Sequence, residues 1–157
     1  MVQEEKKAGN KFSIMNKVSD DDIINLIDSK GDVYQVLYQD IKTSETIVNL
    51  VSDLGTVQPI PVSYIEGKTL EKIIEYCKTA KHDDWVSKFA AMTKHEVFAF
   101  ISASNYLGMP DLLDLTTNTI VNQIKGKTPE QLREYFEITK DATPEEEKEM
   151  LAEWEIK

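Results

Sequence analysis

The sequence predicts a single α/β domain with further helices appended at its carboxy-terminal end, and three observations support this fold class. The chain has 157 residues, which is long enough for one ordinary hydrophobic core rather than two. Two short β-prone runs, IINLID and VYQVLY, flank Ser29-Lys30-Gly31-Asp32, a pattern typical of an antiparallel hairpin that turns at the glycine. Most of the later segments carry apolar residues at helical rather than alternating spacing.

The segments on either side of the hairpin are predicted in the same way. Residues 1–22 are mostly polar and are expected to form a mobile extension. Helices are predicted over 44–54, 68–78 and 93–107, the first with Ser44 as its N-cap and Gly55 as its stop, and the last in a central position. The prolines of residues 58–62 restrict a strand there to an edge. Residues 81–85 are interpreted as a short polar connection, which Trp85 and Phe89 fix onto the body.

The stretch 108–138 is predicted to form two helices joined by a hinge. The apolar stripe of the first helix consists of Leu112, Leu113, Thr116, Thr117, Ile120, Val121 and Ile124. Gly126 ends that helix, and Thr128 with Pro129 begins the second one. Two short amphipathic helices cannot bury both of their faces against each other, so these residues either close the protein's own core or receive a partner. A last helix is predicted from Thr143, with Pro144 in its first turn.

Composition and charge exclude several classes of function. The formal net charge is −10, which argues against a nucleic-acid ligand because phosphate binding depends on clustered basic residues. No apolar run approaches the length that spans a membrane, so no membrane partner is expected. A single cysteine, Cys77, excludes an internal disulfide and favours a reducing compartment, the cytosol or the nucleus.

No pattern for a catalytic, metal or cofactor site is recognisable in the sequence. Gly-Lys-Thr occurs at Gly67 and at Gly126, but neither copy has the upstream glycine that a phosphate loop requires. His82 and His95 have no further ligands at the spacing of a zinc site. Cys77 falls in an apolar stripe without a catalytic signature, so we expect neither an enzyme nor a cofactor.

Three runs in the second half of the chain resemble a known family. They are Ala103-Ser104-Asn105-Tyr106-Leu107, Leu112-Leu113-Asp114 and Ile124-Lys125-Gly126-Lys127-Thr128-Pro129-Glu130. Together they resemble the S-phase kinase-associated adaptor of SCF ubiquitin ligases, and the similarity extends over roughly residues 23–157. The KGKTPE run and the glutamate-rich tail are its most specific parts.

This resemblance implies a BTB/POZ fold over residues 23–107, which binds a cullin, followed by carboxy-terminal helices over 108–157, which bind F-box proteins. The chain would then be a non-catalytic adaptor of the cytoplasm and nucleus, with a weak homodimer expected when no F-box partner is present. By position, the F-box-binding residues would be Leu112, Leu113, Thr116, Ile120, Val121, Ile124, Pro129, Leu132, Phe136, Ile138 and Trp154. Asn105 and Tyr106 would face the cullin.

The resemblance also leaves departures and alternatives. Val121 and Gln123 stand where smaller or more apolar residues are usual, which would alter the choice of F-box partner. In some protist members the proline matching Pro144 resembles a hydroxylation and glycosylation site, although a helix-starting proline explains the residue equally well. The rival interpretations are an elongin C-like protein, which would end before the second helix of the stretch, and a self-associating BTB/POZ module.

Overall fold

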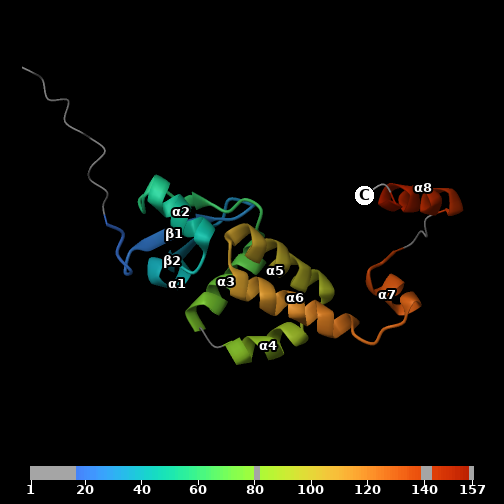
Figure 1. Ribbon diagram of the computed structural model, residues 1–157. Helices are drawn as coiled ribbons and strands as arrows, with labels where there is room; N and C mark the ends of the chain where they lie inside the picture. The colour runs from blue at the N-terminus through green and yellow to red at the C-terminus, as the bar shows by residue number, and fades with distance from the viewer. Residues whose placement is uncertain (1–16, 80–81, 139–142, 156–157) are drawn as a thin grey trace, which may run out of the picture. The chain divides into compact units, whose positions relative to one another are not determined.

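The computed structural model describes residues 17–79, 82–138 and 143–155. The chain divides into two compact units, Met1–Thr119 and Ile120–Lys157, whose boundary falls inside helix α6 (Pro110–Ile124). The boundary predicted from the sequence falls between residues 107 and 108, in the turn before α6, whereas the two units divide between Thr119 and Ile120. Within the first unit, Figure 1 shows the strands with α1 and α2 at one end and α3 to α5 at the other.

The sheet of the first unit is small and mixed. β1 (Ile23–Ile27) pairs antiparallel with β2 (Val33–Leu37), and β3 (Ile60–Pro61) pairs parallel with β1, giving the strand order β2-β1-β3. The hairpin turns through Gly31, whose φ of +91° lies in the region that favours glycine. Both the hairpin and the edge position of the proline-containing strand are therefore confirmed.

A buried carboxylate closes the hairpin. Asp28 accepts hydrogen bonds from the amides of Lys30 and Asp32 at 2.8 and 2.9 Å, and the Tyr34 hydroxyl donates to its other oxygen at 3.5 Å. Burial raises the pKa of Asp28, but these hydrogen bonds outweigh that effect and hold the pKa below its ordinary value. The carboxylate thus stays ionised where it is needed to organise the turn.

The predicted helices of the first unit are confirmed. They appear as α2 (Glu45–Leu54), α3 (Gly67–Thr79) and α5 (Lys94–Leu107), and a short helix that was not predicted, α1 (Tyr38–Ile41), precedes them. Ser44 caps α2 by accepting from the Ile47 amide, and Thr93 forms a capping box with Glu96 at the start of α5. α5 packs against both α2 and α3, and its Phe100 is almost completely buried. The central position expected for this helix is therefore correct.

The polar connection predicted over residues 81–85 is wrong, because helix α4 (His82–Ala90) begins there. Trp85 and Phe89 lie one helical turn apart, and both are buried at 1% and 0% exposure. Their rings are 5.6 Å apart, and Phe89 meets Phe100 of α5 edge-on at 4.9 Å. The two aromatic anchors were recognised from the sequence, but the helix that their spacing forms was not.

The predicted mobile extension is also wrong for its last residues. The amides of Tyr38 and Gln39 donate to the carbonyls of Asp22 and Asp20, and the Lys42 ammonium lies 2.9 Å from the Asp20 carboxylate. Asp20 and Asp22 are therefore attached to α1 and to the residue that follows it. Residues 1–16, the rest of the predicted extension, lie outside the described residues.

The contact at Gly67 provides a test of the hairpin. A Cβ added at Gly67 would come within 2.2 Å of the Tyr34 hydroxyl and 2.7 Å of an Asp28 carboxylate oxygen. We expect Gly67→Ala to lower the free energy of unfolding by about 1–3 kcal/mol, although alanine normally strengthens a helix. Urea denaturation measures the change, and Lys68→Ala on the exposed neighbour serves as control. An alanine variant as stable as the wild type would contradict this account.

Candidate functional site

Helix α6 turns one apolar stripe into the interior. The residues of this stripe are Leu112, Leu115, Thr116, Thr119 and Ile120. The buried threonine hydroxyls are satisfied within the helix, where Thr116 donates to the Leu112 carbonyl and Thr119 to the Leu115 carbonyl, both at 2.9 Å. Leu115 was missing from the stripe predicted from the sequence, and Thr117 and Val121 lie outside it.

This burial corrects part of the predicted F-box-binding set. Leu112 and Thr116 are completely buried, and Leu112 belongs to the hydrophobic core of the domain. They cannot line an exposed groove, because contact with a partner would require the core to open. Both residues instead lie in the interior, beneath the surface of α6. Ile120, at 8% exposure, is nearly as inaccessible.

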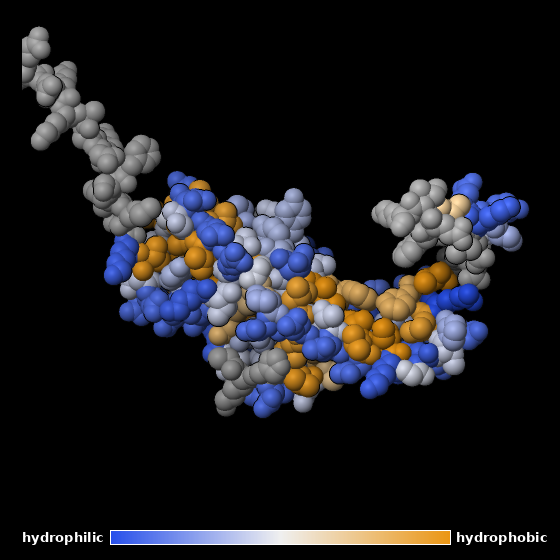
Figure 2. All heavy atoms as spheres, viewed as in Figure 1, coloured by the Kyte–Doolittle hydropathy of each residue, from blue (hydrophilic) through white to orange (hydrophobic). Residues whose placement is uncertain are grey.

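Other predicted residues remain accessible in the Ile120–Lys157 unit. Val121, Phe136 and Ile138 are 49%, 40% and 54% exposed. Ile124 and Leu132 are half-buried in this unit, and Pro129 is exposed; Leu113, in the first unit, is half-buried too. Figure 2 shows hydrophobic residues, in orange, over the end of α6 and over α7. We refer to Val121, Phe136 and Ile138 as the exposed triad.

The hinge and the helix that carry part of the triad follow from local sequence. Gly126 adopts a φ of +78° after α6, which a residue with a Cβ rarely takes. Thr128 and Gln131 form a capping box at the start of α7 (Pro129–Tyr135), with Pro129 at its first position. The predicted helix–hinge–helix arrangement is therefore confirmed.

Gln123 and Tyr135 connect the end of α6 to α7. The Tyr135 hydroxyl donates a short hydrogen bond to the Gln123 side-chain oxygen, and the Lys127 ammonium lies 5.8 Å from the centre of the Tyr135 ring. Tyr135 also meets Phe136 edge-on, with ring centres 5.0 Å apart. Gln123, noted in the sequence as a departure from the family pattern, thereby helps to fix the ring beside Phe136.

A left-handed residue ends α7 and directs Ile138. Glu137 has a φ of +58°, the only positive value at a non-glycine residue in the described part of the chain. The amide of Ile138 donates to the Arg133 carbonyl at 2.9 Å, and the amide of Glu137 donates to the Glu134 carbonyl at 3.1 Å. These two bonds form a Schellman motif, in which glycine is the usual left-handed residue.

The last helix, α8 (Pro144–Glu155), begins as the sequence predicted. Thr143 caps it, accepting from the Glu146 amide, and the Glu146 carboxylate accepts from the Thr143 amide at 2.7 Å. Hydrogen bonds from Thr143 lower the pKa of Glu146. Pro144 is exposed at the first helical position, and its modification stays a prediction. The side chain of Trp154 lies outside what the structure describes.

The predicted cullin-facing pair lies on the last turn of α5, in the first unit. Asn105 is exposed and Tyr106 half-buried. The Thr46 hydroxyl donates to the Tyr106 carbonyl at 2.7 Å, and the Ser44 hydroxyl donates to the Leu107 carbonyl. The start of α2 therefore holds the backbone that carries this pair.

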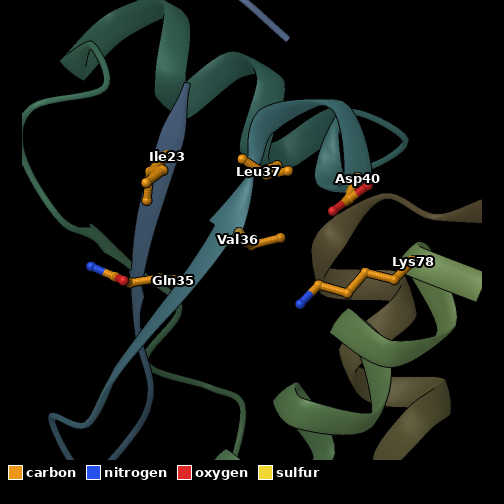
Figure 3. Close-up of a pocket in the computed structure, with 6 residues that line it drawn as sticks. All are labelled: Ile23, Gln35, Val36, Leu37, Asp40 and Lys78. Atoms are coloured by element: carbon orange, nitrogen blue, oxygen red, sulfur yellow. The ribbon is translucent and has the colours of Figure 1, made fainter. Parts of the chain in front are cut away.

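One accessible hollow of the first unit is too small for a typical small-molecule ligand. This hollow, shown in Figure 3, lies beside β2, where Lys78 of α3 and Asp40 of α1 both reach towards Val36. Its volume of about 180 Å³ is below the roughly 300–1,000 Å³ that ligand pockets occupy. Among the described residues, no cluster of His, Cys, Asp or Glu could hold a metal ion, and no helix is long and apolar enough to span a membrane.

Both parts of the chain match one known family. Residues 22–82 match the Skp1 family, tetramerisation domain, and residues 110–155 match the Skp1 family, dimerisation domain. SKP1-like protein 11 of Arabidopsis thaliana is 39% identical over 136 residues, which cover 80% of this chain and 90% of that protein. SKP1-like protein 1A of the same plant is 36% identical over 149 residues, covering 83% and 93%. The E3 ubiquitin ligase complex SCF subunit sconC of Aspergillus flavus is 38% identical over 123 residues, covering 66% and 76%.

The small mixed sheet with its packed helices is the POZ domain that residues 22–82 match. The chain belongs to the Skp1 family. The family resemblance and the POZ fold inferred from the KGKTPE run and its neighbours are thus confirmed.

The conformation of Glu137 generates a prediction for this unit. Glu137→Gly removes the Cβ that disfavours a left-handed backbone, so the turn after α7 should be stabilised by about 1 kcal/mol. The amide of Ile138, which donates across this turn, should then exchange its hydrogen about five times more slowly. Hydrogen exchange followed by NMR measures this. Glu134→Gly inside α7 is the control and should accelerate the exchange of this amide. Slower exchange in the control would show that the effect does not depend on the left-handed backbone of residue 137.

The environment of Cys77 yields a pH prediction. Burial raises the pKa of the Cys77 thiol to about 11. The contribution of the buried neutral thiol to the stability of the fold is therefore complete below the unfolded pKa near 8.5, and it is lost as the pH rises towards 11. At pH 8, alkylation by iodoacetamide should be at least about a hundredfold slower in the folded than in the unfolded protein. Mass spectrometry of timed samples gives both rates, and equal rates would show that the thiol is exposed.

Proposed function

We propose that this chain is the adaptor of an SCF-type ubiquitin ligase, and that it links a cullin to F-box proteins through two separate surfaces. The observation that carries the proposal is the exposed triad. Val121, Phe136 and Ile138 are large apolar side chains of one unit that stay 40–54% exposed, and their burial by a partner would be favourable. The SCF subunit named among the relatives supports the same role.

The chemistry of the triad fits an F-box partner that inserts helices. Burying a side chain such as Phe136 contributes about 1.5–3 kcal/mol, and a few such residues commonly supply most of the affinity of an interface. The capping of α7 and the Gln123–Tyr135 hydrogen bond fix the position of Phe136 before binding. Less conformational entropy is then lost when the complex forms.

The cullin would bind the first unit at Asn105 and Tyr106. These residues belong to Met1–Thr119, whereas the triad belongs to Ile120–Lys157, so each partner has its own contact residues. An adaptor requires separate contact residues, because both partners must be bound to it at the same time. The role is non-catalytic, and the thiol of Cys77, with its raised pKa, has little of the thiolate that nucleophilic chemistry requires.

Self-association through the same surface is the second candidate. The match of residues 110–155 to a dimerisation domain favours it, and a second copy could cover the triad when no F-box protein is present. An elongin C-like role is disfavoured by α7 and α8, the elements that such a protein would lack. We also propose the cytoplasm and nucleus as the site of action, consistent with one unpaired cysteine, Cys77.

The triad gives the decisive test. Phe136→Ala should weaken binding of a purified F-box protein by about 2 kcal/mol or more, roughly 30-fold, because truncating a central anchor leaves its pocket empty. Affinity for cullin should not change. Isothermal titration calorimetry measures both. Leu54→Ala, which shortens a side chain of similar exposure, 45%, in the first unit, is the matched control.

The outcomes separate the two candidates. Unaltered F-box binding by Phe136→Ala, or no binding of any F-box protein by the wild type, would contradict the adaptor role. A tight homodimer that does not dissociate when F-box protein is added, detected by sedimentation, would favour the self-associating module.

A further inference from the structure

Among the aromatic side chains that the structure describes, that of Tyr64 is the most exposed, at 85%. It lies in a tight turn after β3, in which the amide of Ile65 donates to the carbonyl of Val62 at 3.0 Å. Val62 and Ile65 are buried, at 0% and 2% exposure. The turn is therefore attached to the core on both sides, while the tyrosine between them points to solvent.

The backbone of this turn is held by further hydrogen bonds. The amide of Val62 donates to the carbonyl of Ile27 at 2.8 Å, and the amide of Ser29 donates to the carbonyl of Ile65 at 3.1 Å. The β1–β2 hairpin thus fixes the turn, and Tyr64 is displayed from a rigid base. A side chain so exposed buries too little area to explain its presence by the stability of the fold.

The neighbour of Tyr64 is Tyr106 of α5. Their ring centres lie 5.3 Å apart at an interplanar angle of 63°, an edge-to-face contact that aromatic pairs prefer. Tyr106 is also held from the α2 side, since the Thr46 hydroxyl donates to its carbonyl. Two segments distant in sequence therefore place two aromatic rings together on the surface.

We infer that Tyr64 belongs to the cullin-binding surface and forms, with Tyr106, one aromatic anchor for an apolar side chain of the cullin. The inference rests on the proposed function, which assigns Asn105 and Tyr106 to the cullin. Direct ring contact makes Tyr64 continuous with that surface. Tyrosine pairs of this kind offer large, rigid contact areas, and tyrosine is enriched among the residues that dominate interfaces.

The test compares variants of the full chain bound to an F-box protein and titrated with purified cullin. Tyr64→Ala should weaken cullin binding about tenfold, whereas Tyr64→Phe, which keeps the ring, should stay within about threefold of the wild type. Val57→Ala removes part of an equally exposed side chain, at 87%, and should have no effect. Affinity for the F-box protein should be the same in all variants, which also verifies that they are folded.

Each result has one interpretation. Loss of cullin binding by Tyr106→Ala together with unchanged binding by Tyr64→Ala would overturn the inference and leave the adaptor role intact. Equal weakening of cullin and F-box binding by Tyr64→Ala would also overturn it, because the effect would then be on the fold. Absence of cullin binding by the wild type would refute the proposed function itself.

Discussion

The position of the end of α5, which carries the residues proposed to bind the cullin, depends on one buried hydroxyl, that of Ser44. Its oxygen accepts from the Ile47 amide at the start of α2 and donates to the Leu107 carbonyl at the end of α5. A buried hydroxyl with both bonds made is stabilising, and one that loses a partner leaves a polar group unsatisfied at a cost of about 1–3 kcal/mol. The chain turns at Gly108, with a φ of +62°, immediately beyond this bond. Asn105, Tyr106 and the first turn of α6 are consequently positioned by the same contact.

Both units combine packed and exposed apolar side chains. In the first unit, Trp85, Phe89 and Phe100 stack into a closed core, which provides a rigid support for the Tyr64–Tyr106 pair. In the second unit, the capped helix α7 and the Gln123–Tyr135 bond hold Phe136 in place without covering it. A rigid support and a pre-arranged apolar surface are what an adaptor requires, because neither partner then has to order the site before binding it.

Sequence reasoning succeeded where structure depends on neighbouring residues. Ser44, Thr93 and Thr128 were identifiable as caps or helix starts because a cap bonds an amide within three positions. Prediction from the sequence failed where a contact between residues distant in the chain determines the local structure. Helix α4 was missed because Trp85 and Phe89 form a helical stripe only when the core provides a face for it, and Asp20 and Asp22 are held by bonds to α1 that form only in the folded chain. The F-box set was assigned by resemblance, and the burial of Leu112 and Thr116 has removed two of its members.

The sequence by itself determined the family, the hairpin, most of the helices and the hinge at Gly126, since motifs, caps and glycine conformations are properties of short segments. Only the tertiary structure decided which stripe of α6 faces the core, that Gln123 meets Tyr135, and that Tyr64 lies against Tyr106. The physical reason is that helical periodicity shows where apolar residues recur along a segment, whereas packing with the rest of the chain determines which of them water can still reach.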